Sequence, residues 1–304
     1  MYPCCFLRRD NVLSLSDFQK VELRDKPLFD DFYSRFPPSH SSDLFTTIIS
    51  WEEYVEYRYL VHDNCLLLIS RSAKELEVRV PIGPFQKEVL EQAVTLARKE
   101  HASIGYIKSM EKDLLLRQYP SLTFHEDRDL YDYVYRTSDL ATLPGTAYAK
   151  IRNRLHKFTN ETPYTTEDIT DNNMDEVHEF LKRWCLWKDC ASDEILEQER
   201  KAIVYSMAHY FDLGLSGIVL RIEGTIEAAS VFEQMNRDTA VIHFEKGSPD
   251  YDGIYKAVNM EAAKRLQTQS QFIDREEDLG VPGLRKAKLS YHPHHFVEVY
   301  HTTP

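Results

Sequence analysis

Hydrophobic patterns in the second half of the chain follow an order that only a few folds accommodate. Residues 164–170 and 172–189 have the periods of a strand and a helix, and a second helix reaches residue 214, with Ser192 as its N-cap. Two strands flank the hairpin signal Gly224-Thr225, and a third strand covers 238–247. A helix over 253–267, a strand over 271–278, a short helix or loop and a strand over 296–302 complete the order.

The first half shows a similar order, from a helix over 26–36 to a strand over 131–137, without obvious identity to the second half. It includes a short helix that begins near Trp51 and an amphipathic helix over 84–101. Two similar orders indicate two copies of one α+β fold, each a mixed sheet flanked by helices. The turn signal Pro144-Gly145 places the boundary between domains 1–144 and 145–304.

Charge and cysteine usage narrow the class of protein. The 304 residues carry a net charge of −12, which argues against a general nucleic-acid binder and against DNA as a partner. The five cysteines are odd in number and contain no C-x-x-C pair, which is typical of reduced thiols. No secretory signal or membrane-spanning stretch is predicted, so we expect a cytoplasmic protein, although peripheral membrane contact remains compatible with the sequence.

The segment GTAYAKIRNRLHKF, residues 145–158, is predicted to form a basic amphipathic helix. Lys150, Arg154 and Lys157 share one face of it, with Arg152 and His156 nearby, and an apolar stripe would hold it to the protein. One interpretation is a site for phosphate or another polyanion, to which arginine offers bidentate contacts. The alternative is a solvated helix that acidic neighbours balance, and the sequence favours neither.

Two further groups of polar residues do not indicate a site. His292, His294 and His295 lie close together, but Pro293 interrupts their spacing and no Cys or acid completes a ligand set, so no metal site is predicted. Ser230 and Ser290 lack a G-x-S-x-G motif, which argues against a serine nucleophile.

The element order resembles the acyltransferase fold known as GNAT, in which a central sheet is splayed between its fourth and fifth strands. In addition, residues 132–158, 243–259 and 272–293 resemble a largely uncharacterised prokaryotic family named for its similarity to the C-terminal domain of phosphatidylglycerol lysyltransferase. This resemblance covers nearly the whole chain. It implies a tandem GNAT fold, shared more distantly with Fem-type peptidoglycan aminoacyltransferases.

Those relatives transfer an amino acid from aminoacyl-tRNA to an amine or hydroxyl of a lipid or peptide. The resemblance therefore implies an acyltransferase or aminoacyltransferase, with aminoacyl-tRNA or acyl-CoA as the donor and an unidentified acceptor. In the Fem-type relatives a basic helix after the first GNAT unit contacts the substrate. The similar stretch here contains Lys150, Arg152, Asn153, Arg154 and Lys157.

The turn before residue 254 departs from the coenzyme A pattern of the fold. Coenzyme A acyltransferases bind pyrophosphate there on a Q/R-x-x-G-x-G/A turn at a helix N-terminus. Here Asp250 and Asp252 occupy the turn and would repel pyrophosphate. Tyr251, Tyr255 and Asn259 follow on one helical face, where they either line a pocket or only pack.

Charged residues crowd the strand predicted over 271–278, QFIDREED. Period two would put Asp274 and Glu276 on one face and Arg275 on the other. If this is the fifth GNAT strand, these groups line the cleft at the splay, with Glu245 across the opening. The alternative is a closed ion-pair network, which stabilises weakly because of desolvation.

A transferase with this cleft needs a carboxylate that orients or deprotonates the acceptor, for which the candidates are Glu245, Asp274 and Glu276. Arg275 or Lys288 would stabilise the developing oxyanion. The remaining candidates for substrate binding are Lys150, Arg152, Asn153, Arg154, Lys157, Tyr251, Tyr255, Asn259 and Tyr291. Two alternatives stay open: an acetyl-CoA-dependent N-acetyltransferase with an atypical phosphate loop, and a binding protein that keeps the cleft without catalysis.

Overall fold

The computed structural model describes residues 12–73, 75–190 and 194–302, and the chain divides into two compact units. The first unit comprises residues 1–36, 54–127 and 299–304, and the second comprises residues 37–53 and 128–298. This division differs from the domains 1–144 and 145–304 expected from the sequence. The predicted N-cap Ser192 lies outside the described residues.

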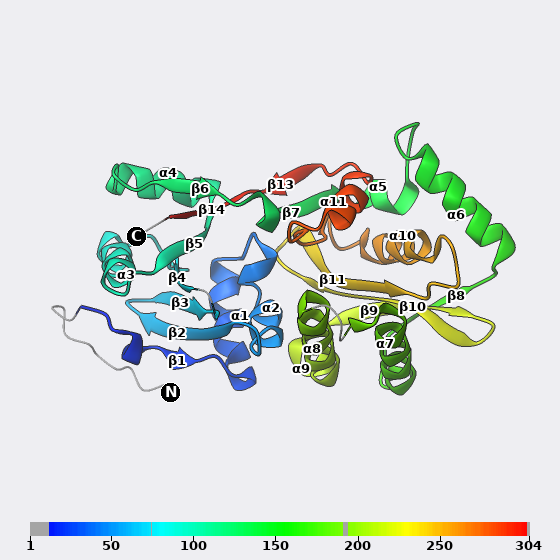
Figure 1. Ribbon diagram of the computed structural model, residues 1–304, viewed down its shortest axis with the longest axis horizontal. Helices are drawn as coiled ribbons and strands as arrows, with labels where there is room; N and C mark the ends of the chain where they lie inside the picture. Colours follow the sequence, from blue (N-terminus) through cyan, green and yellow to red (C-terminus); the bar gives the residue numbers. More distant parts are fainter. Residues whose placement is uncertain (1–11, 74, 191–193, 303–304) are drawn as a thin grey trace. The chain divides into compact units, whose positions relative to one another are not determined.

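The first unit is built on a seven-stranded sheet (Figure 1). Its strands, in spatial order, are β1 (Gln19–Lys20), β2 (Glu56–His62), β3 (Cys65–Arg71), β4 (Leu76–Arg79), β5 (Ser103–Lys108), β14 (Val299–Thr302) and β6 (Phe124–Glu126). β4 and β5 are parallel, and the other neighbours are antiparallel. The helices are α1 (Lys26–Arg35), α3 (Lys87–Lys99) and α4 (Ser109–Gln118). α3 buries its apolar face against β3, β4 and β5.

The second unit has its own seven-stranded sheet. Its strands, in spatial order, are β13 (His295–Val297), β7 (Asp132–Arg136), β12 (Phe272–Asp274), β11 (Thr239–Gly247), β10 (Thr225–Gln234), β9 (Ser216–Ile222) and β8 (Thr165–Asp168). The helices are α2 (Phe45–Ser50), α5 (Thr137–Thr142), α6 (Ala149–Glu161), α7 (Met174–Lys188), α8 (Glu194–Ala208), α9 (Tyr210–Leu213), α10 (Ile254–Leu266) and α11 (Pro282–Leu289). The short helix predicted near Trp51 ends at Ser50.

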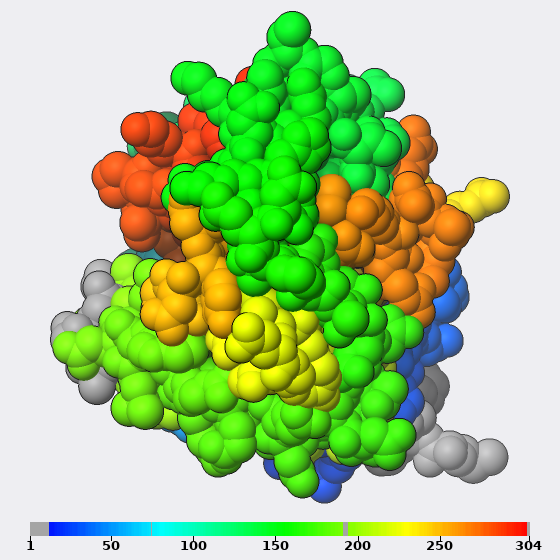
Figure 2. All heavy atoms as spheres, turned by 90° about the vertical axis from the view of Figure 1, so that its right-hand side faces the viewer, coloured from blue at the N-terminus to red at the C-terminus, as the bar shows by residue number. Residues whose placement is uncertain are grey.

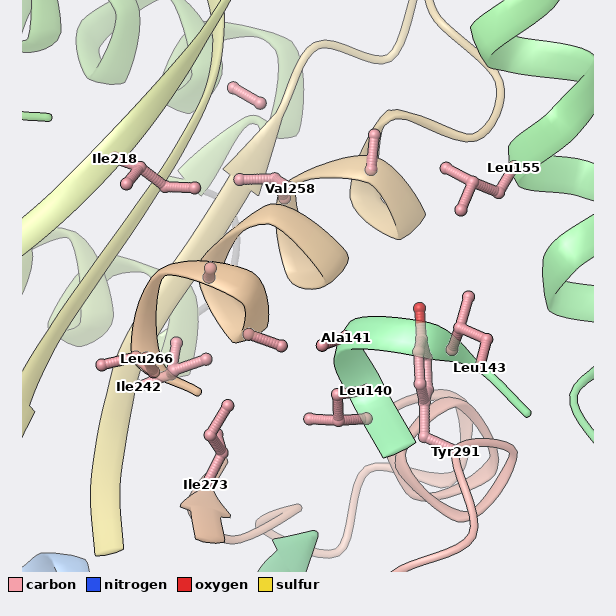
Figure 3. Packing of buried hydrophobic residues seen from close by; sticks show 14 of the residues in the cluster. Leu140, Ala141, Leu143, Leu155, Ile218, Ile242, Val258, Leu266, Ile273 and Tyr291 are labelled. Atoms are coloured by element: carbon pink, nitrogen blue, oxygen red, sulfur yellow. The ribbon is translucent and has the colours of Figure 1, made fainter. Parts of the chain in front are cut away.

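The core of the second unit lies around α10 (Figure 3). Val258 and Leu266 of α10 pack with Ile218 and Ile242 of the sheet. The other buried residues of α10 include three alanines, and such small side chains allow α5 and α6 to approach it closely. Figure 2 shows α6, in green, running along the surface of this unit.

Two strands belong to the sheet of the other half of the sequence. β7 was predicted within the first half, but it pairs with β12 and β13 in the second sheet. The predicted final strand over 296–302 is divided into β13, which joins the second sheet, and β14, which joins the first between β5 and β6. Local periodicity cannot predict this exchange, because it specifies a strand and not its neighbours.

The second sheet is splayed at the parallel pair β11 and β12. The two strands pair only from Thr239–Phe272 to Val241–Asp274, although β11 continues to Gly247. A bulge interrupts β11, since Phe232 of β10 pairs with Ile242 and Val231 pairs with Phe244, which leaves His243 without a partner in the ladder.

The strand predicted over 271–278 is also shorter than expected. It ends at Asp274, and Glu276 has a left-handed φ of 58°, so the period-two assignment of Glu276 to the face of Asp274 is wrong.

Candidate functional site

The charged loop after β12 is held by one lysine. The Nζ atom of Lys288, on α11, donates to the carbonyl oxygens of Arg275 at 2.5 Å, Glu276 at 3.0 Å and Glu277 at 2.6 Å. Burial, with the nearby positive charge of Arg275, lowers the pKa of Lys288. An ammonium has three protons, and these three carbonyls use all of them. In the structure Lys288 therefore orders the loop and has no proton left for a substrate oxyanion.

Arg275 and Glu245 face each other across the splay. The Nη2 atom of Arg275 lies 2.6 Å from Oε2 of Glu245, whose Oε1 accepts a hydrogen bond of 3.0 Å from Nδ2 of Asn259 on α10. The guanidinium also lies 4.9 Å from the ring centre of Tyr291 and 5.7 Å from that of Tyr135. Four of the sequence-predicted residues, Glu245, Asn259, Arg275 and Tyr291, thus meet at one point, but the side chain of Glu245 is only 8% exposed.

Three polar atoms around Glu245 have no hydrogen-bond partner among the described residues: Oγ of Ser230, Oδ1 of Asn259 and Nη1 of Arg275. Ser230 is the direct cross-strand neighbour of Glu245 in the β10–β11 ladder, and neighbours in a ladder share a face of the sheet. Buried polar groups without a partner are rare in folded proteins, because each costs about 1–3 kcal/mol. In this cluster the donor Nη1 of Arg275 and the acceptor Oδ1 of Asn259 lack partners, and the hydroxyl of Ser230 could serve as either donor or acceptor.

A second ion-pair group spans the bulge. His243 contacts Oε1 of Glu276 at 2.9 Å through Nδ1 and Oε1 of Glu233 at 2.8 Å through Nε2. Burial by itself would lower the pKa of His243, but the two carboxylates raise it to about 10. An imidazolium that donates from both nitrogens therefore joins β10, β11 and the loop. No motif marked His243 in the sequence, since its partners are distant along the chain.

Asp274 is fully buried beside two other acids. It accepts a hydrogen bond of 2.7 Å from the backbone N–H of Glu276, and burial together with neighbouring Asp132 raises its pKa well above the usual range. Burial, followed by the charges of Asp132 and Glu276, raises the pKa of Glu277 to about 8. Asp132 is itself held by the N–H and Oγ of Ser41, at 2.6 and 2.8 Å. Asp274 thus has no surface that a substrate could reach in this structure.

The basic helix was predicted correctly as a helix, and its charged residues have different surroundings. Arg152 donates from Nη1 to the carbonyl oxygens of Leu143 and Gly145, each at 2.5 Å, which ties the turn before α6 to the helix. Arg154 pairs with the carboxylate of Asp252, at the turn before α10, and lowers the pKa of that group. The remaining candidates on this helix are exposed: Lys150, Asn153 and Lys157.

Lys256, on α10, was not among the predicted site residues. Its ammonium lies 5.6 Å from the ring centre of Tyr291, and burial, followed by the charges of Arg154 and Arg275, lowers its pKa. The predicted Tyr255 lies nearby in sequence, and its hydroxyl accepts a hydrogen bond of 2.9 Å from Nε1 of Trp184. Its neighbour Tyr251 is partly buried against the core. Lys256 lies three residues before the predicted Asn259 on the same helix, and this i,i+3 spacing could have suggested it.

Neither a metal-binding group nor a membrane-spanning helix is found in the described part of the chain. Across residues 12–73, 75–190 and 194–302, no group of three or more His, Cys, Asp or Glu side chains could hold a metal ion. Over the same ranges, no helix has the length and apolar character needed to cross a bilayer.

Comparison with known proteins identifies the family. The family described as "Phosphatidylglycerol lysyltransferase, C-terminal" matches residues 33–303. A crystal structure of a conserved protein of unknown function from Bacteroides thetaiotaomicron is 32% identical, with a TM-score of 0.88 over 94% of this chain and 98% of that one. None of the curated proteins compared with the chain matches it.

More distant structures support the fold. The C-terminal domain of a putative lysylphosphatidylglycerol synthetase from Agrobacterium fabrum and L-PGS from Bacillus licheniformis are each 15% identical, with TM-scores of 0.65 and 0.62. In both comparisons 92% of this chain and 91% of the other chain are covered. FemX has a TM-score of 0.55 at 10% identity, over 94% of this chain and 95% of that chain. The chain therefore has two tandem GNAT-like units with an acyltransferase-type fold, and it belongs to the family of the phosphatidylglycerol lysyltransferase C-terminal domain.

Proposed function

We propose that this chain transfers an aminoacyl group, supplied by an aminoacyl-tRNA, to an amine or hydroxyl of an acceptor. Membership of the family and the likeness to a lysylphosphatidylglycerol synthetase domain and to FemX support this reaction class. The observation that carries the proposal is the set of three unsatisfied polar atoms around Glu245: Ser230 Oγ, Asn259 Oδ1 and Arg275 Nη1.

An aminoacyl ester offers the groups that this cluster lacks. Its α-ammonium has three N–H donors for Asn259 Oδ1, Ser230 Oγ and the Glu245 carboxylate, and its ester carbonyl oxygen accepts from Arg275 Nη1. An acetyl group has the carbonyl oxygen but no ammonium, so it would leave the Asn259 acceptor unsatisfied. The cluster therefore favours an aminoacyl donor over acetyl-CoA.

The transfer itself needs no covalent enzyme intermediate. The acceptor nitrogen or oxygen adds to the ester carbonyl, the C–O bond to the ribose breaks, and the ribose hydroxyl recovers a proton. In this proposal Arg275 stabilises the oxyanion that forms at the carbonyl. Of the three carboxylates considered as the base, Glu276 has the most exposed side chain, at 25%, whereas Asp274 is inaccessible and positions the loop.

The basic groups beside this cluster suit the phosphates of the donor. Lys256 is partly buried beside the proposed position of the ester, and Arg154 is available once it leaves Asp252. Lys157 lies one helical turn further along α6. In this proposal Arg154, Lys157 and Lys256 contact phosphate, while Arg152 holds the turn before the helix.

The test compares binding of acetyl-CoA with binding of three tRNA ligands to the purified chain: aminoacyl-tRNA, the same molecule with its α-amine acetylated, and deacylated tRNA. We expect aminoacyl-tRNA to bind at least tenfold more tightly than the N-acetylated form, since a hydrogen bond to a charged group contributes about 1.5–3 kcal/mol. Asn259→Leu and Ser230→Ala should reduce that ratio, whereas Arg265→Gln, which alters the exposed Arg265–Asp168 pair, should not. Equal binding of the three ligands, or tight binding of acetyl-CoA alone, would overturn the proposal.

A further inference from the structure

The first unit contains a polar hollow of about 510 Å³. It lies where the ends of four adjacent strands meet: Arg71 ends β3, Leu76 begins β4, Ser103 begins β5 and Thr302 ends β14. His101, just after α3, completes this end of the sheet. These segments are far apart in the sequence, and only the strand order β3-β4-β5-β14 brings them together (Figure 1).

The donors that line the hollow are not used within the described part of the chain. The side chains of Arg71 and His101 form no hydrogen bond or ion pair there, and the side chain of His301 has only a ring stack with His125, at 5.4 Å between centres. The hydroxyl of Ser103 is shielded from solvent and has no partner among the described residues. Arg71 also lines a second hollow of about 340 Å³, beside Arg58 and Glu56.

The acids of the lining are already engaged. Glu100 lies 3.9 Å from the ammonium of Lys99, and Glu75 also takes part in an interaction within the protein. The hydrogen-bonding capacity that remains is therefore mainly that of donors: a guanidinium, two imidazoles and a hydroxyl. Such a set is complementary to the oxygens of a phosphate, to which arginine donates two parallel hydrogen bonds.

We propose that this hollow binds a phosphate group, with Arg71, His101 and His301 as the donors. The hollow is much larger than a phosphate group, so it also has room for the organic part of a phosphate ester. This site belongs to the first unit and does not depend on the transfer proposed for the second unit. Its occupant is defined by the phosphate, which a small nucleotide and free inorganic phosphate both supply.

The test uses the full chain, inorganic phosphate and AMP, at constant ionic strength. The imidazole signals of His101 and His301 should shift on titration with a saturable dependence, and that of the exposed His156 on α6 should not. Arg71→Gln should weaken binding about tenfold. Arg98→Gln removes the same charge from an exposed position on α3 and serves as the matched control.

The outcomes show which phosphate compound binds and whether the binding is specific to this hollow. Tighter binding of AMP than of inorganic phosphate supports a nucleotide-like ester, and equal binding supports inorganic phosphate as the ligand. Shifts that do not saturate, or an equal loss in Arg71→Gln and Arg98→Gln, would overturn the proposal, because they would reflect only general charge. His101→Gln and His301→Gln, which should each weaken binding about threefold, provide a second measurement if Arg71→Gln fails to fold.

Discussion

Arg275 and Glu245 form a buried ion pair across the splay of the second sheet, with 2.6 Å between Nη2 and Oε2. The two residues are 30 positions apart: Glu245 lies on β11 and Arg275 directly follows β12, and the pairing of these two strands ends early. The pair therefore holds together the point at which the sheet opens, and it also presents the unsatisfied Nη1 atom of Arg275.

Removal of one member of this pair should lower the stability of the fold. Arg275→Gln leaves the Glu245 carboxylate buried without its cation, and we expect the free energy of unfolding to fall by about 3–5 kcal/mol in urea titrations. Arg265→Gln, which breaks the exposed pair with Asp168, should cost about 0–1 kcal/mol. A loss below 1 kcal/mol in Arg275→Gln would show that water already reaches Glu245.

Lys288 is expected to be structural. Lys288→Met keeps much of the side-chain volume but removes the donors from three carbonyl oxygens, so the free energy of unfolding should fall by about 3 kcal/mol. Lys286→Met, at an exposed position of the same helix, should change it by less than about 0.5 kcal/mol. Equal stability of the two variants would mean that the loop does not depend on Lys288.

Stability should decrease from mildly acidic to alkaline pH. Glu277 and His243 both have folded-state pKa values above their ordinary values of 4.5 and 6.5, at about 8 and about 10. The folded chain therefore binds these two protons more tightly than the unfolded chain does. The contribution of Glu277 is complete below pH 4.5 and is lost as pH rises through about 8, and that of His243 is complete below pH 6.5 and is lost through about 10.

Urea unfolding at pH values from 5 to 9.5 measures this dependence, and we expect the free energy of unfolding to fall by several kcal/mol, since each pKa unit corresponds to about 1.4 kcal/mol. Glu277→Gln should flatten the curve below pH 8, and His243→Gln should flatten it above pH 7. A stability that stays constant or rises across this range would contradict the assigned protonation of both groups.

Substitution of the two arginines of α6 should have different effects, on stability for Arg152 and on ligand binding for Arg154. Arg152→Gln removes the bonds to the carbonyls of Leu143 and Gly145, so it should lower the melting temperature without a specific effect on a phosphate ligand. Arg154→Gln should leave the melting temperature nearly unchanged and weaken tRNA binding, with the loss shrinking as salt rises. Asp252→Asn frees Arg154 and should strengthen that binding. If Arg152→Gln weakened tRNA binding and Arg154→Gln lowered the melting temperature, the roles proposed for the two arginines would be reversed.

Local chemistry determined most of the elements of this protein. Period-two and helical patterns were sufficient for the β9–β10 hairpin at Gly224, for α7 and for α10, because each element buries one continuous apolar face. The order of these elements also predicted the splayed sheet and placed Glu245 opposite Arg275. The charged stretch after residue 273 was recognised, but not its conformation.

Only the tertiary structure decided which strands are neighbours and which polar groups meet. β7 and β14 exchange sheets because pairing depends on edges and registers that no local period encodes. The ammonium of Lys288 holds the carbonyls of the loop that contains the left-handed Glu276, and the positive charge of His243 depends on carboxylates from two other segments. The sequence likewise did not indicate the roles of Ser230, Asp132 and Lys256. Their hydrogen bonding and pKa values depend on burial and on nearby groups, which are properties of the folded chain.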